Sequence, residues 1–339
     1  MRKLLKAREL TSFSFVLILF ILVGVVNSGF LAPENLLLTL NSSVVFTLLA
    51  AGTAFIIITG EIDVSIGAVM GLCAAVSASM IRDGAPWPAA AAAAVLTGIA
   101  CGAINGAGLV FVKIPSIIMT LGTAGIIRGL IYVYTGGRWV ENIPAGYKAA
   151  SQASFLGVSF FYWGALLVVI AGILIMTRLR QGRYFAAVGD NTACATLLGI
   201  PVRFTKILAF ILAGALYAVA GLMFVSRIGF VTPMVGSGYE MKAIAACVLG
   251  GVSLSGGVGS LAGAAIGALF MASVGRILVF LNSTADDDVI TGVMLVVIVV
   301  ADALLQQRAV EKARRQRLLA KTNASMNISS GENDATIAQ

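Results

Sequence analysis

The residue types that most often carry catalysis or bind metals are scarce in this chain of 339 residues. It contains no histidine, which excludes histidine-based catalytic triads and histidine metal sites. Its four cysteines have neither the spacing of metal ligands nor that of a disulfide framework. We expect Cys73, Cys101, Cys194 and Cys247 to pack as small apolar residues. The sequence therefore predicts no catalytic residue, no metal site and no cofactor bound by the chain itself.

The chemistry of a self-powered carrier is also missing. No Gly-x-x-x-x-Gly-Lys-Ser/Thr sequence occurs, so the chain has no P-loop for ATP. The acidic residues mostly lie near the ends of apolar stretches, as Glu61, Asp63 and Glu240 do. A carrier that moves protons or ions typically has acids buried in the membrane. Transport driven by a separate subunit fits this pattern better than ion coupling within the chain.

One segment, residues 178–206, has a pattern suited to contact with another protein. Asp190 or Asn191 can cap a short helix over Ala193–Leu198, and Gly199 can end it. Such a helix would lie on the membrane surface rather than cross the bilayer. Two interpretations stay open, a solvated basic connection that anchors two membrane helices and a docking helix that fits a groove on a partner protein.

The composition around this segment is that of an integral membrane protein. Apolar residues make up 59% of the chain and charged residues 11%, against roughly half and a quarter in soluble domains. The 38 glycines suit closely packed membrane helices. This balance excludes a soluble enzyme, a nucleic-acid-binding domain and a disordered protein. It predicts an all-α, polytopic bundle of about ten transmembrane helices, with membrane lipid as a partner and no nucleic acid.

Each membrane-spanning helix needs about 20 apolar residues. The predicted ranges are 12–31, 38–59, 64–81, 89–112, 115–134, 161–177, 207–226, 241–255, 258–281 and 289–305. An even number places both termini on one side, and the segments rich in Lys and Arg, which give the net charge of +8, then lie in the cytoplasm. We expect a cytoplasmic N-terminus over 1–11, a transmembrane domain over 12–305 and a basic cytoplasmic tail over 306–339.

Glycines recur at four-residue spacing in several of these ranges, which lets a neighbouring helix approach closely. The sets are Gly98, Gly102 and Gly106; Gly67 and Gly71; Gly125 and Gly129; and Gly263 and Gly267. We expect each set to form a helix–helix contact.

Four stretches of the chain resemble, in the same order, the motifs of one family. Residues 60–67 resemble the family's Gly-Gly-Ile-Asp-Leu-Ser-Val-Gly and depart from it at Glu61. Residues 105–123, 182–200 and 248–260 match in turn. The family is that of the bacterial ABC-type sugar importer permeases, which includes the ribose, xylose, galactose and autoinducer-2 transporters.

The matching positions fall into two groups. Outside the 178–206 loop they are Gly60, Asp63, Ser65, Gly67, Asn105, Gly106, Pro115, Thr120, Leu121, Gly122, Gly250, Gly251 and Gly257. Inside it they are Arg183, Gly189, Asp190, Asn191, Ala193, Leu197, Gly199 and Ile200. The resemblance implies that this loop couples the membrane helices to an ATPase. A bulky residue at Gly189 is then expected to uncouple transport while leaving insertion intact.

The resemblance implies a non-catalytic permease subunit that moves a small sugar or sugar-like signal inward across the bacterial plasma membrane. Its implied partners are an ATPase, often with two fused nucleotide-binding domains, a periplasmic sugar-binding protein, and a second permease that is either another copy or a different chain. Residues 135–141 and 226–251 favour autoinducer-2, with rhamnose, ribose or xylose next. A secondary carrier driven by an ion gradient is the alternative.

Polar groups inside membrane spans are costly unless they are paired. The candidates for the translocation path are Asn41, Asn105, Thr120 and Arg128. They either meet sugar hydroxyls or hydrogen-bond to neighbouring helices.

Overall fold

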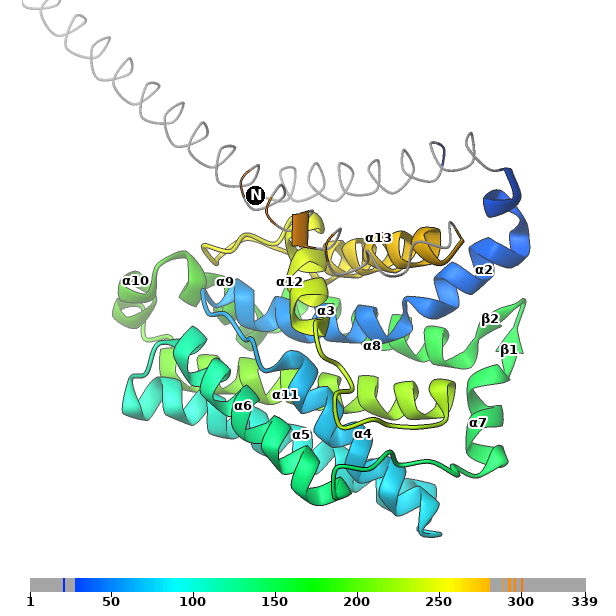
Figure 1. Ribbon diagram of the computed structural model, residues 1–339. Coiled ribbons are helices and arrows are strands. Elements are labelled where there is room, and N and C mark those ends of the chain that lie inside the picture. Colours follow the sequence, from blue (N-terminus) through cyan, green and yellow to red (C-terminus); the bar gives the residue numbers. More distant parts are fainter. Residues whose placement is uncertain are drawn as a thin grey trace, which may run out of the picture. The chain divides into compact units, whose positions relative to one another are not determined.

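The structure, a computed structural model, describes residues 28–280 together with the single positions 21, 289, 292, 293, 296 and 300. Residues 28–280 lie within one compact unit, Met1–Met294, and a second unit comprises Leu295–Gln339. The described part of the first unit is almost wholly helical (Figure 1). The expected spans 12–31 and 289–305 lie largely outside the described residues, as do the N-terminus and the tail.

The elements follow one another along the chain as short and long helices with one hairpin. The first are η1 (Ser28–Leu31), α2 (Pro33–Ser42), α3 (Val44–Ile58), α4 (Ile66–Arg82), α5 (Trp87–Ala107), η2 (Gly108–Val112), α6 (Ser116–Thr135) and α7 (Ala145–Gln152). They are followed by β1 (Ser154–Phe155), β2 (Val158–Ser159), α8 (Phe160–Arg178), α9 (Arg180–Asp190), α10 (Thr192–Leu197), α11 (Val202–Ile228), α12 (Tyr239–Leu249) and α13 (Leu261–Phe280). The two strands pair antiparallel, with Ser154 opposite Ser159.

Within the described part of the chain, five helices are long and apolar enough to cross a membrane. They are α5 continued by η2, α6, α8, α11 and α13. Helices α2 and α3 count as a sixth span if the bend of 41° between them lies within one crossing. Helix α12 has only 11 residues, about 17 Å, against a hydrocarbon core of about 30 Å. The predicted span 241–255 is therefore wrong as a full crossing, because its helix ends at Leu249.

Helix α11 is the central element of the core, and it packs against α3, α4 and α5. The glycines at positions 98, 102 and 106 allow α5 to reach it. A methyl group at Gly98 would overlap the carbonyl oxygen of Gly214, and one at Gly102 would overlap that of Phe210. The predicted close contact along this glycine set is confirmed, and it brings two membrane helices to the distance of backbone contact.

The other glycine sets divide into two kinds. Gly67 and Gly71 face the turns around Val235 rather than a helix, and Gly263 faces Gly250 at the end of α12, so both sets make close contacts. Positions 125 and 129 on α6 are exposed, with no atom within 4 Å of an added methyl group. Among the described residues, the predicted contact is not made by that pair.

Two groups of connecting elements lie at opposite ends of the long helices (Figure 1). Helix α7 and the β1–β2 hairpin lie at one end, and α9 and α10 lie at the other. The segment 178–206 thus contains two helices, whereas the sequence predicted one. Helix α9 was missed because its residues, Arg180–Asp190, were interpreted as a solvated basic connection.

Replacing Gly98 by valine is expected to lower the free energy of unfolding by about 1–3 kcal/mol or more, because overpacking forces α5 away from α11. Gly125→Val is the matched control, since it adds the same side chain to a membrane helix where the space is open. Its expected effect is within about 0.5 kcal/mol. Apparent melting temperatures of the purified variants in detergent test this, and equal losses would contradict it.

Candidate coupling site

A tight turn, residues 59–65, joins α3 to α4, and separate parts of the chain meet there. Gly60 has a φ of +82°, a left-handed conformation that a residue without a side chain adopts without strain. Asp63 closes the turn, because its Oδ1 accepts hydrogen bonds from the Ser65 N–H at 2.7 Å and the Ser65 hydroxyl at 2.6 Å. These local bonds prepare the start of α4.

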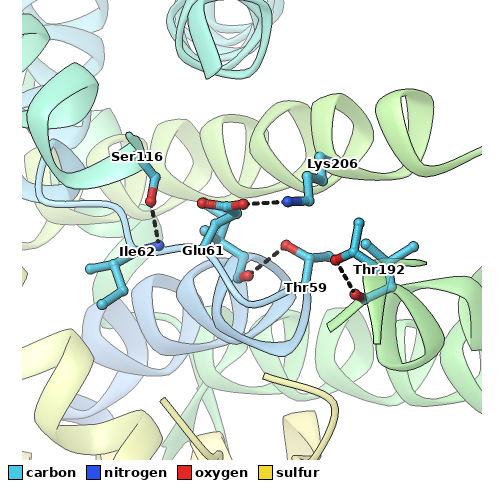
Figure 2. Close-up of polar contacts among 8 residues, drawn as sticks. Thr59, Glu61, Ile62, Ser116, Thr192 and Lys206 are labelled. Carbon is cyan, nitrogen blue, oxygen red and sulfur yellow. Dashed lines mark hydrogen bonds and ion pairs between the residues drawn. The ribbon is translucent and has the colours of Figure 1, made fainter. Parts of the chain in front are cut away.

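Helix α6 supplies partners for the backbone of this turn. Ser116 Oγ accepts a hydrogen bond from the Ile62 N–H at 3.2 Å (Figure 2). One helical turn later, Thr120 Oγ1 accepts from the Val64 N–H at 3.0 Å. Since a backbone N–H without a partner is costly away from water, these two hydroxyls fix the turn against α6.

A buried polar cluster surrounds Asp63, which is 2% exposed. The hydroxyl of Tyr217 on α11 hydrogen-bonds to its carboxylate and lies 3.3 Å from the hydroxyl of Thr53 on α3. Asn105 on α5 donates to Ser65 Oγ at 3.0 Å. Burial raises the pKa of the Asp63 carboxyl above its ordinary value, and the hydrogen bonds from Ser65 and Tyr217 oppose this rise. The cluster ties three long helices to the turn.

The segment 178–206 packs on the opposite side of the same turn. Gly189, near the end of α9, lies so close to α3 that a methyl group would overlap the carbonyl oxygen of Ile58. That carbonyl accepts a hydrogen bond from the Gly257 N–H at 3.0 Å. A methyl group on Gly256 would touch the backbones of both Gly60 and Gly189. Two glycine-containing loops and the last turn of α9 therefore meet backbone to backbone.

The four stretches that match the family motifs thus converge on one turn, although they lie far apart in sequence. Some of their residues lie elsewhere. Leu121 and Gly122 are exposed on α6, and Pro115 precedes that helix as its N-cap. Gly106 packs on α11, and Gly250 packs on α13.

The short helix predicted within the segment is present as α10. Its N-cap is Asn191, whose side chain accepts a hydrogen bond from the Cys194 N–H at 2.9 Å. Gly199, with a φ of +74°, ends it, and the Ile200 N–H donates back to the Ala195 carbonyl at 3.0 Å. Both predicted end signals are confirmed, while the helix itself begins and ends one residue earlier.

The outer face of this segment is exposed. The side chains of Arg183, Asp190 and Ala193 are on the surface. Leu197 is 88% exposed and the adjacent Leu198 is 79% exposed. We call these two leucines, together with Phe204 (60% exposed) on the first turn of α11, the apolar docking patch. The sequence analysis did not single out Leu198 or Phe204, although apolar residues within a basic surface segment are a signal that could have done so.

The four path candidates are hydrogen-bonded within the chain. Asn41 accepts from the Ser159 N–H at 2.8 Å and so holds the β1–β2 hairpin. Arg128 donates to the carbonyl oxygen of Val235 and so holds the stretch that faces α4. Thr120 accepts a hydrogen bond from the backbone of the turn, and Asn105 donates one to Ser65 at the end of the turn. Each of these hydrogen bonds goes to a turn or to the hairpin, and the two interpretations that the sequence left open both stand.

Comparison with known proteins identifies the family. The family model of a branched-chain amino acid transport system/permease component matches residues 35–299. The chain belongs to this family. No solved structure matches this permease at a significant level.

Curated relatives carry a more specific name. The autoinducer 2 import system permease protein LsrC of Enterobacter sp. (strain 638) is 42% identical to this permease over 320 residues, which cover 94% of this chain and 92% of the relative. The protein of the same name from Klebsiella pneumoniae has the same identity and coverage. The one from Salmonella typhi is 39% identical over 311 residues, 91% of this chain and 90% of the relative.

These matches confirm the resemblance to ABC-type importer permeases, including those for autoinducer-2. The protein is a permease subunit of an ABC-type importer and a multi-pass protein of the bacterial inner membrane. The coupling site is therefore a feature of a transporter subunit.

Replacing Gly189 by valine is expected to lower the free energy of unfolding by about 1–3 kcal/mol or more, because the side chain would push α9 away from α3. That a bulky residue here uncouples transport while leaving insertion intact stays a prediction. Ala193→Val is the control, since Ala193 is exposed on α10. The fraction of monodisperse protein after extraction in detergent tests this, and equal fractions for the two variants would contradict it.

Proposed function

We propose that this permease imports autoinducer-2 into the cytoplasm and is powered by a separate ATPase subunit. The names of the curated relatives support the substrate, as do the stretches 135–141 and 226–251. A periplasmic binding protein delivers the substrate, and a second permease, either another copy or a different chain, completes the path. The permease binds no cofactor and catalyses no reaction, because ATP is hydrolysed on the partner.

The observation that carries this proposal is the apolar docking patch. Helix α10 has only six residues, so it cannot cross a membrane, and its exposed leucines are not explained by contact with the lipid core of a bilayer. An exposed apolar patch on a short surface helix marks a contact with another protein. Basic residues flank it, as expected at a cytoplasmic surface.

The packing around Gly189 supports a route for the movement. When ATP binding draws the nucleotide domains together, the ATPase displaces α10 and with it α9. Because Gly189 touches the end of α3 without an intervening side chain, α9 displaces the turn 59–65 as a rigid body. The buried cluster at Asp63 then moves together with α5 and α11.

The topology belongs to the same proposal. An even number of spans, with both termini in the cytoplasm, places α9, α10 and the turn 59–65 on the ATPase side, and the β1–β2 hairpin on the periplasmic side. The positions of α10 and the hairpin at opposite ends of the long helices support this orientation. The N-terminus over 1–11 and the tail over 306–339 then both face the cytoplasm.

Replacing Leu197 by aspartate is expected to abolish copurification of the ATPase and to reduce uptake of labelled autoinducer-2 at least about tenfold. A charge in the centre of an apolar contact costs several kcal/mol. Leu156→Asp is the matched control, because Leu156 is 78% exposed at the hairpin. The measurements are pull-down of the tagged permease from its native membrane and uptake by intact cells.

An ATPase that still copurifies with the Leu197→Asp variant would contradict the docking role of α10. Uptake that collapses with the proton gradient, from a permease that purifies without an ATPase, would establish the secondary carrier instead.

A further inference from the structure

A partly buried ion pair links the segment 178–206 to the turn 59–65. Lys206 on the first turn of α11 binds Glu61 in the turn 59–65, and their side chains are only 18% and 13% exposed (Figure 2). Within the described part of the chain there is one other such pair, Arg82 with Asp83, which joins sequence neighbours at an exposed helix end. The Glu61–Lys206 pair therefore stands out as a charged contact between distant segments.

Lys206 is connected to α10 through a short link, residues 198–201, in which every N–H group is hydrogen-bonded. The Leu198 N–H donates to the Cys194 carbonyl at 3.0 Å, and the Gly199 N–H donates to the Thr196 carbonyl at 3.0 Å. Beyond the link, Thr205 Oγ1 donates to the Pro201 carbonyl at 3.0 Å. Because these bonds leave the link little freedom, a displacement of α10 is delivered to the first turn of α11.

Glu61 is attached equally closely to the membrane helices. Its N–H donates to the Ile56 carbonyl of α3 at 3.3 Å, and the next residue, Ile62, is held by Ser116 of α6. A displacement of the Glu61 carboxylate is therefore transmitted to both helices. The ion pair lies between these two attachments.

The segment 178–206 contacts the end of α3 at Gly189 and the turn through the Glu61–Lys206 pair. These two contacts differ in the force that they transmit. The backbone contact at Gly189 is steric, so it resists approach but offers only weak dispersion against separation. An ion pair shielded from water resists separation, because parting leaves two poorly hydrated charges. A push from α10 thus travels through Gly189, and a pull requires an attractive contact.

We propose that Glu61 and Lys206 form the tether that pulls the turn 59–65 back when the ATPase and α10 move away from the membrane helices. Both are positioning residues, and the tether rests on the proposed function of the permease. Without it, less of the return movement of α10 reaches the turn after ATP hydrolysis, and the next cycle begins with the helices less tightly coupled.

The test measures hydrogen–deuterium exchange of the turn 59–65 in the purified complex of permease and ATPase, with and without ATP. The wild-type complex is expected to show an ATP-dependent difference at this turn. In Glu61→Gln and Lys206→Met the difference should fall about tenfold, the upper range for residues that transmit coupling. The charge-swapped variant Glu61→Lys/Lys206→Glu should recover at least half of it.

The matched control is Asp83→Asn, which breaks the exposed pair and should keep the wild-type exchange difference. A second readout, labelled autoinducer-2 imported per ATP hydrolysed, should follow the exchange difference in every variant. ATPase binding should stay at the wild-type level, because none of these residues lies in the apolar docking patch.

Three results would overturn the tether. They are an unchanged exchange difference in both neutral variants, a loss that the charge swap does not restore, and a wild-type complex without any ATP-dependent difference at the turn. If neither Glu61→Gln nor Lys206→Met assembles with the ATPase, the charge-swapped variant alone is the test. It must then show at least half of the wild-type exchange difference. A wild-type permease that purifies without an ATPase contradicts the proposed function rather than the tether.

Discussion

Backbone contact at the turn 59–65 is the constraint on which the rest of the structure depends. Gly60, Gly189 and Gly256 come from three distant stretches, and a methyl group on Gly256 would touch the backbones of the other two. One on Gly189 would overlap the carbonyl oxygen of Ile58. A well-packed interior cannot absorb an added side chain without moving its neighbours. The segment 178–206, the end of α3 and the loop around Gly256 therefore keep one arrangement relative to one another.

Hydrogen bonds connect this backbone contact to the membrane helices. Hydroxyls from α6 hold the turn's backbone, and the cluster at Asp63 connects it to α3, α5 and α11. In a membrane, polar groups must find partners within the protein, so each of these bonds restricts where its helix can lie. Polar residues within the apolar helices therefore help to hold the architecture of this permease.

Exposed apolar residues have two different meanings in this chain, and helix length distinguishes them. Val133 on α6 is 81% exposed, on a helix of 20 residues that can cross a bilayer, so contact with the lipid core accounts for its exposure. Leu197 is as exposed, but α10 has six residues and follows a basic helix at the end of the bundle. The same side chain chemistry therefore indicates lipid in one place and a protein partner in the other.

The sequence by itself determined what depends on neighbouring residues. Composition predicted a helical membrane protein, Asn191 and Gly199 predicted the ends of a short helix, and ordered motifs predicted the family. Only the tertiary structure decided that Glu61 meets Lys206, that Arg128 and Asn41 hold loops, that α12 is too short to cross, and that the glycines of α6 have no neighbour among the residues described. The reason is that helix caps and hydropathy act over a few residues, whereas these contacts join segments that only the packed fold brings together.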